Sequence, residues 1–347
     1  MAIETQALAE QIFARYLRNR PKSDIAIGIS YGPEHQFAFL SGAKSPYAGI
    51  DRHSLFELGS LSKTFTAMLL EKAVLSEKAE MSTPVHEVVP QLREVIASGM
   101  TLEQLATHTA GLPYDFPYRM TQKARQEDRD PWAKFTRDDL YEYLAVAKTD
   151  IPGRKWRYSN IGYSILAIAM EHVFDNEYPE VLRLNIFEPL RMIDTVSSTD
   201  VIECATQGHC GENASPYSES PILFGPGDIR SSVNDVLRYL DGAMYPDRAP
   251  YDDFGKFLFS PLSEKKPPRV RQGLGWALVE EDRSWLVTAS GATYGFSCCS
   301  MFSPSKRKAV IVLSNHVDIG GITDLVRAWT SKSNTVQGAT QLLYDAI

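Results

Sequence analysis

Residues 56–66 read FELGSLSKTFT, and this stretch decides how the chain of 347 residues is interpreted. It places Ser60 and Lys63 three residues apart at the start of a pattern with helical period. Residues three apart share a helix face, so we expect the Lys63 amine beside the Ser60 hydroxyl. A serine becomes a nucleophile when a neighbour takes its proton, and a partly desolvated amine can do this. The helix start also offers a backbone N–H where a negative oxygen would develop.

The same Ser-x-x-Lys pattern occurs elsewhere, so position must separate the candidates. Four other serines begin it: Ser41, Ser263, Ser303 and Ser305. Only Ser60 opens an amphipathic helical pattern, whose expected buried stripe is Leu61, Phe65, Met68 and Leu69. The alternative is that Ser60 caps the helix and Lys63 lies in water; the motif alone favours this alternative.

A second signal is the only Tyr-x-Asn among the 16 tyrosines, at Tyr158-Ser159-Asn160. A tyrosine hydroxyl near a Ser/Lys pair can relay a proton to a leaving group, and an asparagine amide can bind a substrate carbonyl. Tyr158 in isolation could equally be a core aromatic residue with a backbone partner. With Ser60 and Lys63, we predict Tyr158 as the third catalytic residue and Asn160 as a substrate-binding residue.

The pattern along the chain indicates an α+β fold. A helix is expected at 4–20, then strands at 25–31 and 36–41, a mostly helical middle from about 61 to 240, and strands at 285–292, 297–302 and 309–314 before a helical tail from 322. Strands at both ends around a helical middle predict a sheet whose terminal segments meet, with a helical region inserted. No linker or repeat divides the chain, so one domain is expected.

Residues 56–66 resemble the nucleophile segment of class C β-lactamases and their relatives, the low-molecular-weight penicillin-binding proteins, D-aminopeptidases and family VIII carboxylesterases. Further similar segments follow in order at 104–113, 158–160, 186–190, 227–235, 273–276 and 310–315. The resemblance implies an antiparallel sheet flanked by N- and C-terminal helices, with a large inserted helical subdomain. It implies one catalytic domain over 1–347, with a sheet part at 1–70 plus 225–347 and a helical part at 71–224.

The chain departs from this family on the strand that lines the site. β-Lactamases and penicillin-binding proteins carry Lys-Thr-Gly there, whereas the aligned residues here are Ala289-Ser290-Gly291, and neither Lys-Thr-Gly nor Lys-Ser-Gly occurs in the chain. The resemblance makes these three residues substrate-binding and implies an oxyanion hole formed by the backbone N–H groups of Ser60 and Ala292. Without the lysine cation, Tyr158 should stay neutral, so we expect Lys63 to be the principal base.

Asp115 falls where class C β-lactamases usually place a glutamine that contacts the acyl side chain. An acid there, with the cation missing, suits a neutral or amine-bearing substrate better than an anionic one. The alternative is a loop acid that faces water.

Composition and charge exclude several classes. The 43 acidic against 36 basic residues give a formal charge of −7, which argues against nucleic-acid binding. The longest apolar stretch, 163–170, is shorter than the about 20 residues of a membrane span, and an acidic N-terminus without an apolar segment predicts a cytoplasmic protein. The four cysteines, Cys204, Cys210, Cys298 and Cys299, are expected as reduced thiols, with neither a metal nor a cofactor.

Two further motifs are set aside. Residues 28–32 read GISYG, the Gly-x-Ser-x-Gly of a nucleophile elbow, but they precede another strand rather than a helix. His108 is expected to be a structural histidine, because the Ser/Lys/Tyr chemistry needs no histidine base.

The expected function is a serine hydrolase that forms an acyl-enzyme at Ser60 and cleaves an ester or amide of a small molecule or peptide. The alternatives are a true class C β-lactamase, an acyltransferase or peptide-bond-forming enzyme, and a non-catalytic binding member. The oligomeric state is left open.

Overall fold

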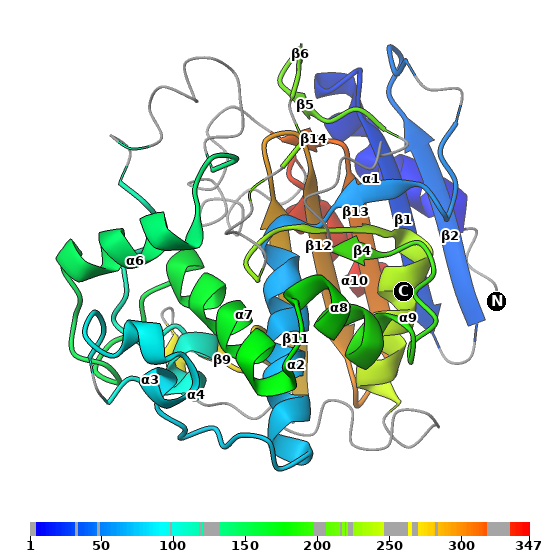
Figure 1. The fold of residues 1–347 in the computed structure, drawn as a ribbon. Helices are drawn as coiled ribbons and strands as arrows, with labels where there is room; N and C mark the ends of the chain where they lie inside the picture. Colours follow the sequence, from blue (N-terminus) through cyan, green and yellow to red (C-terminus); the bar gives the residue numbers. More distant parts are fainter. Residues whose placement is uncertain are drawn as a thin grey trace.

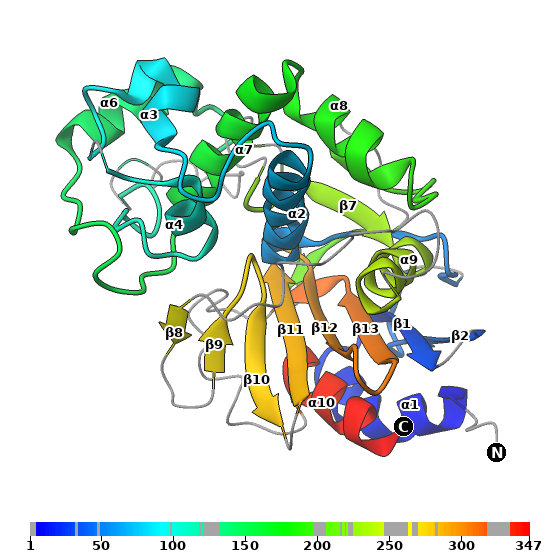
Figure 2. The ribbon, with the colours of Figure 1, turned by 90° about the horizontal axis from the view of Figure 1, so that it is seen from below.

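The computed structural model describes residues 5–31, 34–46, 49–97, 99–117, 120, 132–197, 206–215, 217–218, 220, 225–245, 263–265, 270–281, 284–317 and 334–347. Within them, an eight-stranded antiparallel sheet runs in the order β2-β1-β13-β12-β11-β10-β9-β8 (Figures 1 and 2). Its strands are β1 (Asp24–Tyr31), β2 (Glu34–Ser41), β8 (Ser263–Lys265), β9 (Val270–Gln272), β10 (Ala277–Glu281), β11 (Ser284–Ala292), β12 (Ser297–Ser303) and β13 (Lys308–Ser314).

Strands from the two ends of the chain pair with each other in this sheet, as the second and third strands from the β2 edge. β1 pairs with β13 from Ile25↔Ser314 to Tyr31↔Lys308. Both strands are buried over nearly their whole length, as expected where each face of a sheet is covered. The α+β fold class is therefore confirmed.

Helices from the two ends of the chain cover one face of the sheet. α1 (Thr5–Asn19) and α10 (Val336–Ala346) lie together there, as Figure 2 shows. Their apolar side chains form a core with the strands that includes Phe13, Tyr16, Ile27, Val312 and Leu343. The part of the expected tail at 322–333 lies outside the described residues.

The opposite face carries α9 (Val233–Met244) and α2 (Ser62–Leu75). α9 packs against Gly28, where a Cβ atom would lie 2.8–2.9 Å from the side chains of Leu237 and Val233. Ser30 donates a hydrogen bond to Asp241 of the same helix, at 2.8 Å. The GISYG stretch is thus a strand that packs on a helix, and its glycine and serine serve that contact.

Beyond α2 lies the helical part, with α2 between it and the sheet (Figure 2). Its helices are α3 (Val85–Val88), α4 (Leu102–Ala106), α6 (Arg137–Val146), α7 (Asn160–Phe174) and α8 (Tyr178–Leu182). It also contains the 3-10 turn η2 (Pro90–Leu92) and the π-helical turn η3 (Arg183–Phe187). A further 3-10 turn, η1 (Gly59–Leu61), lies directly before α2. Two small sheets complete the fold, one of β3 (Leu55–Glu57), β7 (Ile229–Ser232) and β4 (Val196–Ser197), the other of β14 (His316–Val317), β5 (His209–Cys210) and β6 (Asn213–Ala214).

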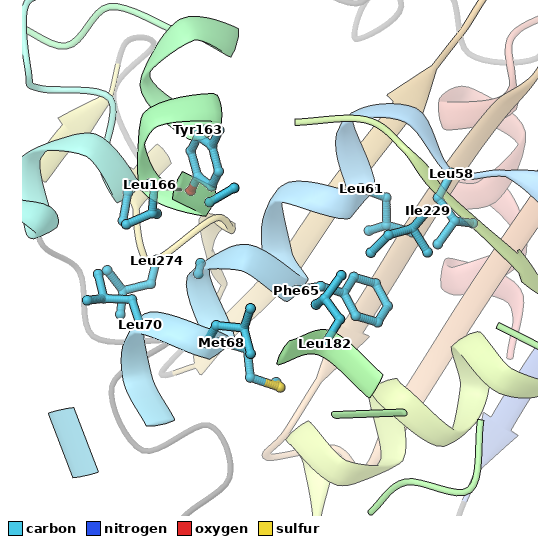
Figure 3. Close-up of a cluster of buried hydrophobic side chains, with 14 of the residues drawn as sticks. Leu58, Leu61, Phe65, Met68, Leu70, Tyr163, Leu166, Leu182, Ile229 and Leu274 are labelled. Atoms are coloured by element: carbon cyan, nitrogen blue, oxygen red, sulfur yellow. Dashed lines mark hydrogen bonds between the residues drawn. The ribbon is translucent and has the colours of Figure 1, made fainter. Parts of the chain in front are cut away.

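The four residues of the expected stripe on α2, Leu61, Phe65, Met68 and Leu69, are buried as predicted, but the expected amphipathic pattern is wrong. Every residue from Ser62 to Glu71 is buried, polar side chains included. The physical reason is that α2 is covered on all sides: Phe65 lies beside Leu182 of α8, and Leu70 faces Leu274 and the helical part (Figure 3). A central helix shows no solvent face, so a stripe is not its signature.

Two smaller findings concern the membrane and the thiols. None of the described helices is long and apolar enough to cross a membrane. Cys298 and Cys299 are free thiols, while Cys204 lies outside the described residues.

Candidate active site

Ser60 lies in the turn η1 that joins β3 to α2, directly against the end of β11. Gly59 adopts a left-handed backbone conformation, with φ of +50°, and a Cβ atom there would lie 2.6–2.8 Å from backbone atoms of Ala292. At Gly291 a Cβ atom would lie 1.8 Å from the Leu58 carbonyl oxygen. The two glycines therefore let the Ser60 turn approach the strand at backbone distance.

The side chains of Lys63 and Tyr158 both lie within hydrogen-bond distance of the Ser60 hydroxyl. Lys63 Nζ lies 3.0 Å from Ser60 Oγ, and the Tyr158 hydroxyl donates to the same oxygen at 2.8 Å. The cap of α2 is Leu61, which has no side-chain capping bond, so Ser60 does not act as the helix cap. Lys63 is only 2% exposed. The alternative of a capping serine beside a solvated lysine is therefore wrong.

The Lys63 amine is held in an apolar and aromatic environment. It donates a second hydrogen bond to the Pro226 carbonyl, at 3.0 Å, and lies 4.9 Å from the ring centre of Tyr158. Burial lowers the pKa of Lys63 to about 7, while the negative charge of Asp115 opposes this shift. Near neutral pH a large fraction of this amine is consequently unprotonated and able to accept a proton.

Tyr158 is fixed by the loop that contains His108. The two rings lie 4.4 Å apart between centroids, and His108 Nδ1 accepts a hydrogen bond from the Ser159 backbone at 3.2 Å. Ser159 in turn caps α7 and donates to the Pro113 carbonyl at 2.5 Å. Burial raises the pKa of Tyr158 well above its ordinary value, so its hydroxyl keeps its proton. His108 thus contacts the Tyr158 ring and the Ser159 backbone, and its structural role stays a prediction.

The Ala292 backbone N–H points away from β12. Successive N–H groups of a strand point to opposite sides, and the next one, that of Thr293, donates to Phe296 across the turn to β12 at 3.0 Å. On the other side, β10 pairs with β11 only as far as Ala277↔Thr288. The Ala292 N–H is thus directed to the side of β11 that extends beyond the last residue paired with β10.

Asn160 and Asp115 bind each other at the edge of the site. Asn160 Nδ2 donates to Asp115 Oδ2 at 3.1 Å, and Asp115 Oδ1 accepts from the Phe116 backbone at 2.7 Å and from Trp132 Nε1 at 3.1 Å. Burial raises the pKa of Asp115, whereas these hydrogen bonds and Lys63 favour its charged form. Asp115 is therefore part of the site network, and the alternative of a loop acid that faces water is wrong.

The three predicted residues of β11 divide between its faces. Gly291 faces the Ser60 turn, and Ala289, two residues earlier, shares that face and packs on the same apolar core. Ser290 lies between them, so strand alternation turns its side chain to the opposite face. The role of Ser290 in substrate binding stays a prediction.

The sequence did not reveal two members of the site. Pro226 contributes only a backbone carbonyl, which leaves no side-chain signature. Trp132 lies in a segment without periodicity, and only its indole N–H contact with Asp115 brings it to the site. The only indication in the sequence is the residue type itself, since tryptophan occurs just five times in the chain.

Comparison with known proteins gives consistent results. A family model described as Beta-lactamase matches residues 25–323. The D-alanyl-D-alanine-carboxypeptidase/endopeptidase AmpH of Escherichia coli (strain K12) is 25% identical over 297 residues, which cover 79% of this chain and 76% of the relative. A Beta-lactamase of Pseudomonas fluorescens is 24% identical over 326 residues, covering 83% and 86%. Penicillin-binding protein 4* of Bacillus subtilis (strain 168) is 26% identical over 292 residues, covering 76% and 61%.

The family match spans most of the chain, from β1 past β13, and includes the segment with Ser60 and Lys63. The resemblance of residues 56–66 to this family is therefore confirmed, and the family indicates a serine hydrolase. This chain belongs to the beta-lactamase family.

Proposed function

We propose that this protein is a serine hydrolase that forms an acyl-enzyme at Ser60 and cleaves ester or amide bonds of small molecules or peptides. One observation carries the proposal: Ser60 Oγ lies 3.0 Å from the Lys63 amine and 2.8 Å from the Tyr158 hydroxyl. Both distances are within hydrogen-bond reach, which a base and a proton donor need.

In the proposed acylation, Ser60 Oγ attacks the substrate carbonyl carbon while its proton moves to neutral Lys63. The carbonyl oxygen becomes an oxyanion, and the backbone N–H groups of Ser60 and Ala292 donate to it. The carbon–leaving-group bond then breaks, and Tyr158 supplies the proton that the leaving group needs. The Lys63 ammonium restores the proton of Tyr158, so the acyl-enzyme forms with both groups in their starting states.

In deacylation, water attacks the acyl carbonyl and gives up its proton to the same base. The Ser60–acyl bond breaks, the Lys63 ammonium returns this proton to Ser60 Oγ, and the acid product leaves. If an alcohol or amine replaced water, the same steps would transfer the acyl group, so an acyltransferase is tested by adding such acceptors.

The absence of lysine on β11 supports esters and amides without a carboxylate as substrates. Ala289 occupies the face of β11 where a long cationic side chain would reach the site, and the strand sequence SWLVTASGA contains no basic residue. The relatives named as beta-lactamase and as D-alanyl-D-alanine-carboxypeptidase make β-lactams and such peptides the alternative substrates to test.

The test is intact-mass labelling by a fluorophosphonate and by a penicillin. We expect a fluorophosphonate adduct on the wild-type protein and none on Ser60→Ala. Ser305→Ala is the matched control, because Ser305 begins the same Ser-x-x-Lys pattern but lies exposed in the turn between β12 and β13.

The outcomes separate the candidate functions. Failure of both probes to label Ser60 contradicts the hydrolase and favours a non-catalytic binding protein. Labelling by fluorophosphonate without penicillin supports an esterase or amidase. Penicillin labelling, with nitrocefin hydrolysis faster than that of simple esters, supports a β-lactamase instead.

A further inference from the structure

Asp115 is a half-buried carboxylate whose hydrogen-bond partners among the described residues are all donors without charge. They are the Phe116 N–H, the Trp132 indole N–H and the Asn160 amide. A carboxylate has about four acceptor positions. Oδ1 accepts two of these bonds and Oδ2 accepts one, which leaves one acceptor position of Oδ2 open as far as the described residues go.

The charge of this carboxylate is unbalanced when the site is ready to react. Lys63 is the cation that acts electrostatically on Asp115. Lys63 must be neutral to take the proton of Ser60, and its amine contacts Ser60 and Pro226 rather than Asp115. In the reactive form, the described part of the site therefore carries the negative charge of Asp115 without a cation.

The surroundings of Asp115 strengthen any interaction with a cation. Trp132 is 7% exposed and lies 5.8 Å, between ring centroids, from Tyr294 in the turn that follows Ala292. These rings limit the water around the carboxylate, and charge interactions weaken less where water is excluded. Tyr294 comes from the sheet and Asp115 from the helical part, so the two parts enclose the acid beside Ser60.

We propose that the open position of Asp115 binds an ammonium group on the acyl half of the substrate, so that the enzyme prefers cationic acyl groups. The inference rests on the proposed acyl-enzyme function and specifies its substrate class. Asn160 acts as the positioning residue that orients Oδ2 toward the acyl group. A substrate carboxylate would face Asp115 directly and is disfavoured.

The test uses p-nitrophenyl esters in which only the charge changes. Esters of 3-aminopropanoate and 6-aminohexanoate carry an ammonium at two distances from the carbonyl, and butanoate and heptanoate replace it with a methyl group. Hydrogen succinate places a carboxylate there. The value of kcat/KM is measured at about pH 8, where aliphatic amines are still charged, and is divided by the spontaneous hydrolysis rate of each ester.

For the wild-type enzyme, we expect the corrected kcat/KM of the ammonium ester to be at least about tenfold that of its methyl isostere at one of the two lengths. A hydrogen bond to a charged group can contribute this much. Asp115→Asn should reduce this ratio to about one, through KM, whatever its effect on the hydrolysis of heptanoate itself. Asp115→Glu, which retains the charge, should restore part of the preference. Asp138→Asn removes the same charge from an exposed position on α6 and should leave the ratio unchanged.

Two failures are distinguishable. If no ester is hydrolysed and Ser60 is not labelled, the proposed function itself is wrong. If the wild type is labelled and hydrolyses butanoate with a ratio of one at both lengths, the role of Asp115 is wrong. A ratio that survives Asp115→Asn also overturns it. Should Asp115→Asn fail to fold, the wild-type ratio and Asp115→Glu decide.

Discussion

At Lys63, position in the fold changes the chemistry of an ordinary amine. The side chain belongs to a helix that is buried on all sides, and its charge has a backbone carbonyl and a serine as hydrogen-bond partners. Loss of solvation therefore favours the neutral form. The same burial keeps the proton on Tyr158. One lysine and one tyrosine thus become a base and an acid at the same pH.

The first prediction is the pH dependence of hydrolysis. Because the pKa of Lys63 is lowered to about 7, kcat/KM for a neutral ester should rise tenfold per pH unit below 7 and level off above about pH 8. Lys63→Arg keeps the positive charge but cannot give up its proton, so activity should fall about 100-fold or more at every pH. A flat profile from pH 5 to 9 in the wild type would exclude Lys63 as the base.

The second prediction concerns Ala289. A lysine at 289 lies on the site face of β11, so Ala289→Lys should raise kcat/KM for hydrogen succinate esters by about tenfold relative to butanoate esters. The added cation should also lower the midpoint of the pH profile, because it disfavours the charged form of Lys63. Val146→Lys adds the same charge at a side chain that is 75% exposed, and serves as control. Equal effects on both esters would show that position 289 does not contact the acyl group.

At the level of elements, the site depends on how closely η1 approaches β11. Without Gly59 and Gly291, η1 and β11 could not lie this close together, because a side chain at either position would overlap the backbone of the other segment. Backbone atoms on both sides leave little room for relaxation. A Cβ atom at Gly291 would lie 2.8 Å from Ser60 N and one at Gly59 would lie 2.7 Å from Ala292 N, and this close approach supports the proposed oxyanion hole.

The third prediction follows from this contact. Gly291→Ala should separate η1 from β11, lower Tm, and reduce the rate of fluorophosphonate labelling about 100-fold, since one oxyanion donor is displaced. Gly99→Ala is the matched control, because a Cβ atom there meets nothing within 4 Å. Labelling of Gly291→Ala at the wild-type rate would contradict an oxyanion hole that includes Ala292.

Local features of the site could be predicted from the sequence, and tertiary ones only in part. Helical spacing places Lys63 beside Ser60, since both lie within one turn. Spacing says nothing of Tyr158, and only the resemblance to a family linked it to Ser60. Trp132 and the Pro226 carbonyl come to the site through packing between segments without pattern. Five strands of the sheet, β1, β2, β11, β12 and β13, were predicted, and β1 and β13 show why, since their buried residues form continuous apolar runs. The strands β8, β9 and β10 were not predicted.

At the scale of the whole molecule, one apolar core joins the sheet to the helical part. The same cluster of buried side chains contains Phe302 and Ile311 of the sheet and Leu105 and Leu166 of the helical part. α2 lies at its centre, as Figure 3 shows. The active site is therefore built where the two parts share their core, and Ser60 and Tyr158 keep their distance only while that core is intact.

The last prediction tests whether the chain unfolds as one unit. Phe65 stacks on Tyr239 of α9, with ring centroids 3.9 Å apart, and meets Phe187 of η3 edge-on at 6.1 Å, so it contacts both parts. Phe65→Ala should lower the free energy of unfolding by about 3–5 kcal/mol. Far-ultraviolet circular dichroism and tryptophan fluorescence should still give one coincident transition. The exposed Tyr31→Ala should change stability by less than about 0.5 kcal/mol. Two transitions, of which Phe65→Ala shifts only one, would mean that the sheet and the helical part are separate folding units.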